Sequence, residues 1–469
     1  MTHLRTLEPS NVLVAPRVLA AKSRTLTKDD RHARTLTSLV FASSTVPGAI
    51  EYLGRSHQSL LASVTAVRTP LASDVSLLIN VLIVLFAFYV AVSRGLSISR
   101  NAADLVLVLT IFAWSLLGLW REGDVTTRSI LDYLTVGLIV IALWCLRPSR
   151  ALYAHVGRLI SILVIYSLIF ALADPAGAYY TSLSGAIGES TKSFIGHNQL
   201  ASVFGHSNTL GIVIALGIPF ILLLERRVVR LVVLALAIWV LVWSSSRTGV
   251  FAAGFAFVLV SILRQVPRRL AGPVVWVSSL IVLAVVFLLP LRTTDPNAFT
   301  RRGAIWIGSL AEAHHNVLFG QGPNWYSDIA QFDNDLGNQA SSGHNWFVST
   351  LALGGLVGLV LGAILIFRLL VLASRQLRGT GASVTVYRYW ISVIALSTLE
   401  YIWVTSPRAD LFFSVTFLMI LLLRVEGLEN LRNAEDQETP PRGSIPPTTR
   451  LRGDGTSASG RSLTRSSGA

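Results

Sequence analysis

The sequence has very little cysteine and few charged side chains. Its single cysteine, Cys145, lies inside an apolar run, which excludes an internal disulfide and any metal site of the CxxC type. Only 14% of the 469 residues are charged, compared with about 25% in soluble domains, and 52% are hydrophobic. Because the chain has three lysines, its net charge of +14 comes almost entirely from arginine. This composition indicates a membrane protein.

The N-terminal segment, residues 1–35, lacks the apolar core of a cleavable signal peptide. It is polar and basic, so we expect it to stay in the cytoplasm. The next stretch, 36–53, is a weak membrane span because Pro47 and Glu51 interrupt it. It is nevertheless the only candidate span before the strong apolar run that starts at Val75.

The rest of the chain carries apolar runs close to the roughly 20 residues that a bilayer requires. They are 75–92, 102–120, 129–146, 156–173, 208–224, 230–245, 249–263, 273–290, 346–367, 389–405 and 410–424. With the weak first span they predict an all-α polytopic membrane protein of about twelve transmembrane helices. A domain over 36–424 then contains one large outer loop, 291–345.

The arginines alternate between the predicted sides of the membrane, as short cytoplasmic loops should hold the positive charge. The cytoplasmic group comprises the N-terminal cluster, Arg94 and Arg100, Arg147, Arg150 and Arg158, Arg226, Arg227 and Arg230, Arg264, Arg268 and Arg269, and Arg368, Arg375, Arg378 and Arg388. The alternation predicts a multi-pass protein of the plasma membrane with both termini in the cytoplasm. After Arg424, residues 425–469 become rich in Pro, Ser, Thr and Gly and are predicted to form a disordered tail.

Four polar features fall on the predicted outer side, where a loop of this length is uncommon unless it has a function. They are residues 194–211, the turn 244–249, the segment from Arg302 to Trp306, and residues 343–346. Each has a structural alternative. Arg247 could extend its charge to the interface, Arg302 and Trp306 could form a cation–π pair, and His206, Asn208 or His344 could cap or hydrogen-bond locally.

Taken together, these features resemble the O-antigen ligase and polymerase family over roughly 190–365. The resemblance is carried by Gly-His-Ser-Asn-Thr-Leu-Gly at 205–211, Ser-Ser-Arg-Thr at 245–248, Arg302 and Trp306, Leu-Phe-Gly-Gln-Gly-Pro at 318–323, His-Asn-Trp-Phe at 344–347, and Leu-Gly-Gly-Leu-Val-Gly at 353–358. It implies transfer of a polyprenyl-diphosphate-linked glycan, on the outer side of the membrane, to an acceptor hydroxyl.

The resemblance also implies roles for individual residues. Arg247 and Arg302 would hold the diphosphate, and His344 would serve the acceptor. The substrate-binding set is predicted to be His206, Asn208, Trp306, Gly320, Gly322 and Asn345. We expect no cofactor, no metal and no nucleic acid; the expected partners are the lipid-linked donor, a glycan, lipid-core or other hydroxyl acceptor, and membrane lipid.

These residue types suit that chemistry. Guanidinium groups stabilise the charge that a departing diphosphate gains. A histidine with a near-neutral pKa can take the proton of an attacking hydroxyl, and attack on the opposite face would invert the anomeric carbon.

Two alternatives remain open. A metal mechanism could use Asp333 and Asp335, whereas the adjacent His314 and His315 point about 100° apart on a helix and cannot readily chelate together. A transporter would need ionisable groups at the bilayer midplane, where only Glu400 qualifies, and Glu400 could instead pair with Arg408 or Arg247. The acceptor stays undecided between a growing glycan, a lipid core and a protein; we favour polymerase or ligase activity for a surface polysaccharide.

Overall fold

The fold was determined as a computed structural model. It describes residues 27–53, 69–95, 102–123, 125–180, 193–195, 198–329, 342–376, 382–401 and 406–438. The predicted N-terminal segment before Thr27, the Asp333/Asp335 pair and the tail after 438 lie outside these ranges. Contacts divide the chain into Met1–Leu428 and Glu429–Ala469. Every helix and strand belongs to the first of these units, apart from the end of the last helix.

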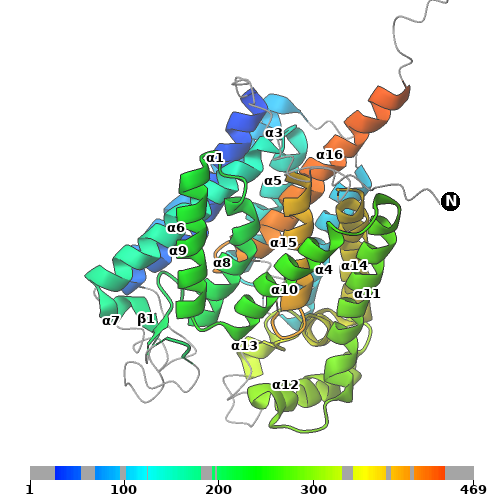
Figure 1. Cartoon of the computed structure of the whole chain (residues 1–469). Helices are drawn as coiled ribbons and strands as arrows, with labels where there is room; N and C mark the ends of the chain where they lie inside the picture. The colour runs from blue at the N-terminus through cyan, green and yellow to red at the C-terminus, as the bar shows by residue number, and fades with distance from the viewer. Residues whose placement is uncertain are drawn as a thin grey trace, which may run out of the picture. The chain divides into compact units, whose positions relative to one another are not determined.

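The described chain is almost entirely helical (Figure 1). Its elements are α1 (Lys28–Tyr52), α3 (Pro70–Arg94), α4 (Ala102–Glu122), α5 (Thr127–Cys145), α6 (Ala151–Ala173), α7 (Pro175–Ala178), β1 (Tyr179–Tyr180), β2 (Gln199–Leu200), α8 (Ser207–Ile221), α9 (Arg227–Trp243), α10 (Arg247–Leu263), α11 (Arg268–Arg292), α12 (Ala298–Ala313), the 3-10 turn η1 (His314–Asn316), α13 (Trp325–Ile329), α14 (Trp346–Gln376), α15 (Ala382–Leu396), the π-helical η2 (Phe412–Phe417) and α16 (Leu418–Glu438). The two strands pair antiparallel, with Tyr179 opposite Leu200.

Within the described ranges, six helices are long and apolar enough to cross a membrane. They are α3, α4, α5, α6, most of α11, and α14, while α8, α10 and α15 are apolar but shorter. The all-helical polytopic architecture is therefore confirmed, and the number of twelve spans stays a prediction. The short helices α8 and α15 are buried on nearly all sides, so protein rather than lipid surrounds them.

Several helices begin where the sequence supplies a cap. The side chains of Thr27, Thr69 and Thr126 each accept a hydrogen bond from a backbone N–H three residues later, at the start of α1, α3 and α5. These caps satisfy N–H groups that a helix leaves open at its first turn. The weak predicted span 36–53 is in fact the longer helix α1, which runs through Pro47 without ending.

The core lies around α8, α15 and η2, in which Leu210–Ile221, Ser383–Leu396 and Phe412–Phe417 are all buried. The helices around them expose large apolar side chains, such as Leu85 on α3 and Ile281 on α11. Because a membrane protein exposes its apolar side chains to lipid, this distribution separates a protein-facing interior from a lipid-facing surface.

One predicted boundary is wrong. The span predicted at 389–405 is the helix α15, which ends at Leu396, so Glu400 lies in the turn after the helix and not within a span. The sequence predicted too long a span because the residues on either side of Glu400 are apolar, although the backbone has already left the helix there. The predicted tail 425–469 stays a prediction; within the described residues α16 continues to Glu438, and Arg424 and Glu426 are buried.

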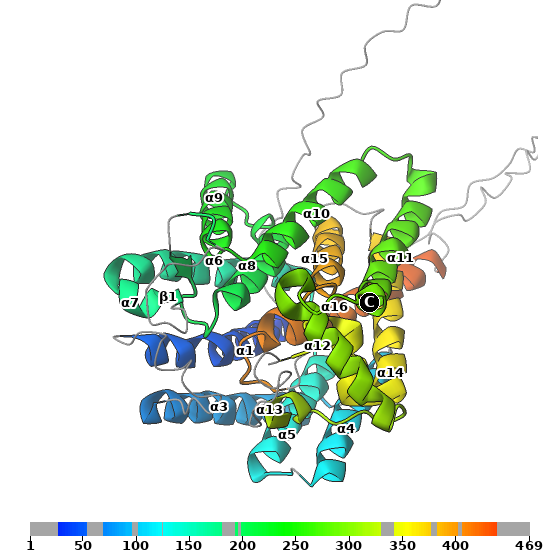
Figure 2. The ribbon, with the colours of Figure 1, turned by 90° about the horizontal axis from the view of Figure 1, so that it is seen from below.

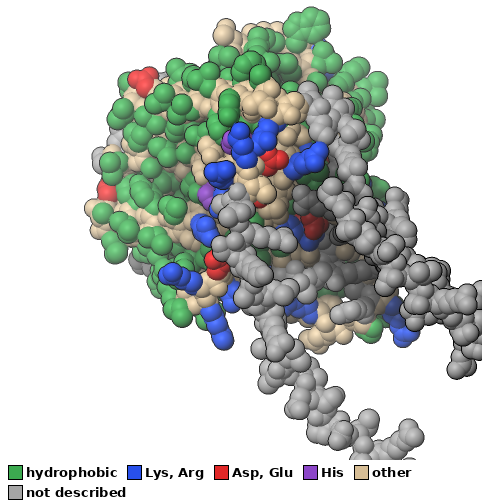
Figure 3. Space-filling model, turned by 90° about the horizontal axis from the view of Figure 1, so that it is seen from above, with side chains coloured by type: hydrophobic (Ala, Val, Ile, Leu, Met, Phe, Trp, Pro, Cys, Tyr) green, Lys and Arg blue, Asp and Glu red, His purple; other side chains and the backbone are tan. Residues whose placement is uncertain are grey.

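The stretch 291–345 is not a plain loop, because it contains α12, η1 and α13 at the end of the molecule drawn lowest in Figure 1. Lys and Arg side chains gather on the opposite face, seen in Figure 3. Ion pairs hold elements together there, joining Arg94 to Asp29 at 2.8 Å and Arg150 to Glu426 at 2.6 Å. The arginine alternation thus corresponds to a basic face opposite α12.

Candidate functional site

The candidate site is built around one buried carboxylate, Glu400, whose side chain is 9% exposed. Its Oε1 accepts hydrogen bonds from Nη2 of Arg302 at 2.7 Å and from Oγ1 of Thr248 at 3.2 Å. Its Oε2 lies 3.4 Å from Nδ1 of His344. Two residues that the sequence predicted to be catalytic, Arg302 and His344, are therefore joined by a third that the sequence placed inside a span.

Thr248 reaches Glu400 because α8 and α10 approach each other closely. A Cβ on Gly211 would overlap the side chain of Ser246, and a Cβ on Gly249 would press on the backbone of Gly211. Ser246 also caps α10 by accepting a hydrogen bond from the Gly249 N–H at 3.2 Å. The glycines and serines of 205–211 and 245–249 thus fix the first turn of α10.

Arg247 occupies the first position of α10, directly before Thr248, and its side chain is exposed. Among the described residues it has no hydrogen bond or ion pair, and it pairs neither with Glu400 nor with Arg302. Arg408, the other partner considered for Glu400, instead bonds to Asp132 at 2.9 Å. Arg247 therefore adds an unpaired positive charge beside the Glu400 cluster.

A break in α12 positions Arg302. Phe299, Thr300 and Arg301 have positive φ angles of 53°, 62° and 69°, so regular helix begins only at Arg302. Gly303 lies against the backbone of Asp295, where a Cβ would overlap the carbonyl oxygen. The helix predicted to open at Thr300 thus starts with a sharp bend that directs Arg302 to Glu400.

His344 and Asn345 fix the entry to α14. His344 has a φ of 45°, a conformation that non-glycine residues adopt rarely. Asn345 is fully buried; its Nδ2 donates to the carbonyls of Val286 and Thr398, both at 3.0 Å, and its Oδ1 accepts from Val348 N–H. Asn345 therefore ties the start of α14 to α11 and to the turn that carries Glu400.

Trp306 supports the same corner from α12. Its ring is fully buried and its Nε1 donates to the carbonyl of Gly343 at 3.0 Å, one residue before His344. Its aromatic neighbour is Phe299 at 5.4 Å, and the cation–π pairs within the described ranges involve other arginines. The structure thus gives Trp306 a different contact from the cation–π pair with Arg302 considered from the sequence.

Gly320 and Gly322 brace a break in α14. Both have positive φ, at 74° and 96°, and their segment bonds to α14 through Gln321 N–H to Ala352 O at 2.7 Å and Gly322 N–H to Leu353 O at 3.0 Å. At Gly355, with a φ of 62°, α14 is interrupted. The 318–323 motif therefore forms a strap across this break, and its predicted contact with substrate stays a prediction.

His206 is the N-cap of α8, since its Nδ1 accepts from Asn208 N–H at 3.0 Å. Its ring also lies 4.4 Å from that of Tyr180. The local capping role considered from the sequence is thus present for His206. The capped end of α8, near Gly211, is the end that packs on α10.

Burial sets the protonation of a tyrosine under the site. Tyr326 on α13 is 4% exposed and donates to Oγ of Ser309 at 2.9 Å. Burial raises the pKa of Tyr326 well above its usual range, with the hydrogen bonds to Ser309 and Ser349 opposing that rise. Tyr326 is therefore a neutral hydrogen-bond donor that joins α13 to α12.

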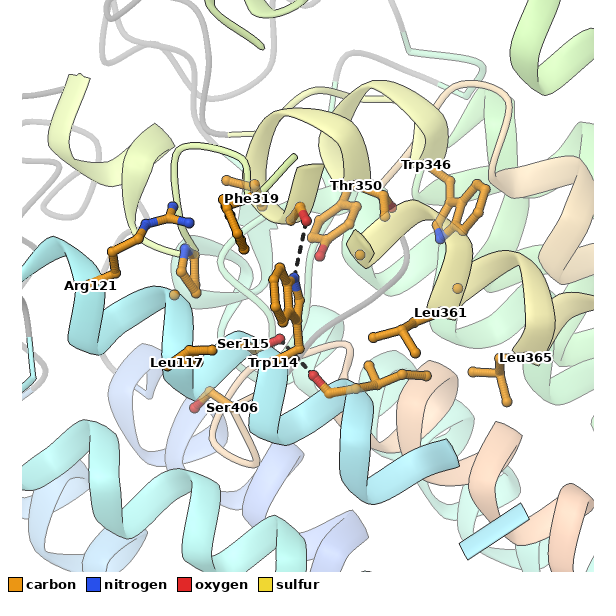
Figure 4. A pocket seen from close by; sticks show the side chains of 18 of the residues that line it. Trp114, Ser115, Leu117, Arg121, Phe319, Trp346, Thr350, Leu361, Leu365 and Ser406 are labelled. Carbon is orange, nitrogen blue, oxygen red and sulfur yellow. Dashed lines mark hydrogen bonds between the residues drawn. The ribbon is translucent and has the colours of Figure 1, made fainter. Parts of the chain in front are cut away.

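A cavity of about 670 Å³ lies between α4 and α14 (Figure 4), and Arg302, His344 and Glu400 are not among the residues that line it. Its lining includes Trp346, two residues after His344, and Tyr401, directly after Glu400. Most of its wall is apolar, and aromatic and polar side chains, among them Phe319 and Arg121, lie toward the 318–323 strap. Nothing in the sequence pattern pointed to this cavity, because α4 carries no motif.

The metal alternative gains no support from clustered ligands, because no three His, Cys, Asp or Glu side chains come together within the ranges that the structure describes. His314 and His315 form an exposed 3-10 turn. Asp333 and Asp335 lie outside the described ranges, so their role is untested.

Sequence reasoning missed two residues of the hydrogen-bonded cluster. Thr248 stood in the 245–248 motif without a role, and Glu400 was assigned to a different location and different partners. The signal for Glu400 was present, because a lone acidic residue in an apolar stretch requires a compensating partner.

Residues 231–363 match the family described as O-Antigen ligase. The match includes Arg247, Arg302 and His344, and it ends before Glu400 and begins after His206. No curated protein matches the chain.

Proposed function

We propose that the protein is a membrane glycan transferase, and the match of residues 231–363 to the O-antigen ligase family supports this proposal. In this proposal a glycan linked to a polyprenyl diphosphate is transferred to an acceptor hydroxyl on the outer side of the plasma membrane. The product is a surface polysaccharide, extended by a polymerase reaction or attached by a ligase reaction.

The observation that carries the proposal is the convergence of Arg302 and His344 on the buried Glu400. A carboxylate that accepts a hydrogen bond from Nδ1–H of His344 leaves Nε2 free to take a proton from the acceptor hydroxyl. The same carboxylate holds only Nη2 of Arg302, so the other N–H donors of the guanidinium remain for phosphate oxygens. One residue thereby positions both the base and the diphosphate clamp.

The reaction then needs one concerted displacement. The acceptor oxygen attacks the anomeric carbon while its proton passes to Nε2 of His344. The bond from that carbon to the phosphate oxygen breaks, and the lipid diphosphate leaves with the bonding electrons. Arg302 and Arg247 stabilise the negative charge that it gains, and the anomeric configuration inverts.

The cavity between α4 and α14 supports a lipid-linked substrate. Its lining from Leu361 to Ile366 on α14 and at Ile111 on α4 is apolar. An apolar chain can occupy such a wall while its phosphates stay near Arg302, because the lining residues Trp346 and Tyr401 lie close in the chain to His344 and Glu400.

A transporter is the alternative function. It requires an ionisable group within a span, and the group that the sequence offered, Glu400, lies in the turn after α15. Its partners Arg302 and His344 suit the active site of a group-transfer reaction better than an ion path through the bilayer.

Transfer by the purified protein tests the proposal. The protein in detergent is given a polyprenyl-diphosphate-linked glycan and candidate acceptors, with and without EDTA, and product length is followed on gels. We expect transfer in both conditions, because two arginines supply the positive charge that a metal would give. Loss of transfer in EDTA and its recovery with added metal would assign the role to Asp333 and Asp335. A deletion strain then shows, from glycan chain length and attachment, which acceptor is used.

A further inference from the structure

Arg388 on α15 is a buried arginine without a compensating anion. The whole residue is 9% exposed, and the guanidinium carbon of Arg388 lies 5.0 Å from the centre of the Phe257 ring on α10. Within the described ranges it makes no hydrogen bond or ion pair, and its Nε has no partner. A buried charge without a partner costs several kcal/mol unless something neutralises it.

Arg424, the other arginine that is buried within the described ranges, has backbone acceptors. Arg424 donates from Nη2 to the carbonyls of Trp144 and Leu146, at 2.6 Å and 2.9 Å. Arg368, whose side chain is 35% exposed, forms a two-bond pair with Asp104 at 2.7 Å and 3.0 Å. Arg388 thus lacks the hydrogen-bond acceptors that Arg424 and Arg368 have among the described residues.

The surroundings of Arg388 define what could neutralise it. Helices α10 and α11 flank α15 (Figure 2), and α10 exposes Phe257, Val258 and Ile262. The end of α10 near Arg388 is the end away from Thr248 and Glu400, and the exposed Arg264, which is the C-cap of α10, adds a second positive charge at that end. A ligand here must carry a negative charge and also fit against apolar, lipid-facing side chains.

We propose that Arg388 and Arg264 bind the phosphate of an anionic phospholipid in the leaflet opposite the candidate site, which the arginine alternation predicts to be cytoplasmic. The phosphate oxygens accept hydrogen bonds from the two guanidinium groups, and the acyl chains lie along Val258 and Ile262. Basic pockets between membrane helices on the cytoplasmic side are suited to anionic headgroups. This site is separate from the Glu400 cluster and does not depend on the proposed reaction.

Thermal unfolding of three purified proteins tests the site: wild type, Arg388→Gln, and Arg375→Gln as a control. Arg375 lies in the last turn of α14 and is exposed, so its variant removes the same charge without removing a buried one. Each protein is measured in neutral detergent alone, and with phosphatidylglycerol, phosphatidylcholine or inorganic phosphate. Native mass spectrometry counts the lipids that stay bound.

Phosphatidylglycerol should raise the melting temperature of the wild type and of Arg375→Gln, and phosphatidylcholine should not. Arg388→Gln should bind the anionic lipid roughly tenfold more weakly, as expected from the loss of one charge-assisted contact. In detergent alone, Arg388→Gln should be at least as stable as the wild type.

Three results would overturn the proposal. A lower melting temperature of Arg388→Gln in detergent, with an unchanged lipid effect, would make Arg388 a structural residue held by Phe257. An equal loss of lipid binding in Arg375→Gln would show nonspecific attraction. A full shift by inorganic phosphate, with none added by the lipid, would identify a site for a free anion.

Discussion

Glu400→Gln separates positioning from folding at the candidate site. The variant keeps the size of the side chain and one acceptor oxygen, but it loses the charge that Arg302 and His344 share. Hydrogen bonds to charged groups contribute about 1.5–3 kcal/mol each, so a single such loss should leave the protein folded. Glu400→Ala should be less stable, because it leaves Arg302, with a side chain 16% exposed, without its anion; breaking a buried pair costs about 3–5 kcal/mol.

The effect of Glu400→Gln on transfer should be larger than its effect on stability. A displacement of about 1 Å at a catalytic group costs about 100-fold in rate, and His344 has no other side-chain partner among the described residues to hold its ring. Donor affinity should be unchanged or higher, because Arg302 is released for phosphate. The assay is steady-state transfer of a lipid-linked glycan, with kcat and KM determined separately. A kcat within about threefold of the wild type in a folded variant, or a rise in KM alone, would refute the positioning role.

Three further predictions concern the clamp, the strap and the topology. Arg302→Lys should lower transfer on the order of 100-fold, since an ammonium keeps the charge but loses the planar fork that binds phosphate; wild-type rates in the same assay would contradict the clamp. Gly355→Ala should lower the melting temperature, because a Cβ there meets the backbone of the strap at a positive φ, whereas Gly254→Ala, with open space around it, should not. Reporter fusions at Ser341 and Gly460 should report opposite sides of the membrane; the same side for both would refute the predicted topology.

The sequence predicted the helical architecture because hydrophobic length is a strong local signal. It predicted which polar turns would meet in space only through the family resemblance, since no local rule brings Arg302 and His344 together. Their meeting depends on three backbone features that sequence patterns do not encode: the bend at Phe299 to Arg301, the positive φ of His344, and the strap across Gly355.

The position of Glu400 shows why the sequence did not predict the rest of the candidate site. An apolar run in the sequence indicates that a segment is buried. It does not distinguish a segment that is surrounded by protein from one that is surrounded by lipid. The turn after Leu396 is buried against α10 and α14, so its composition resembled the end of a span. The pairing of a lone acid with an arginine 98 residues away is a tertiary contact, which the order of residues along the chain cannot supply.

The most direct measurement of the central claim is transfer by His344→Gln and His344→Ala in the purified protein, with donor binding measured in parallel. Glutamine can hydrogen-bond but cannot accept the proton, so both variants should bind the lipid-linked donor as the wild type does and should transfer on the order of 100-fold more slowly. Nearly full transfer by His344→Gln would contradict the account, because His344 would then only position the acceptor and the base would have to be sought at Glu400 or Asp410.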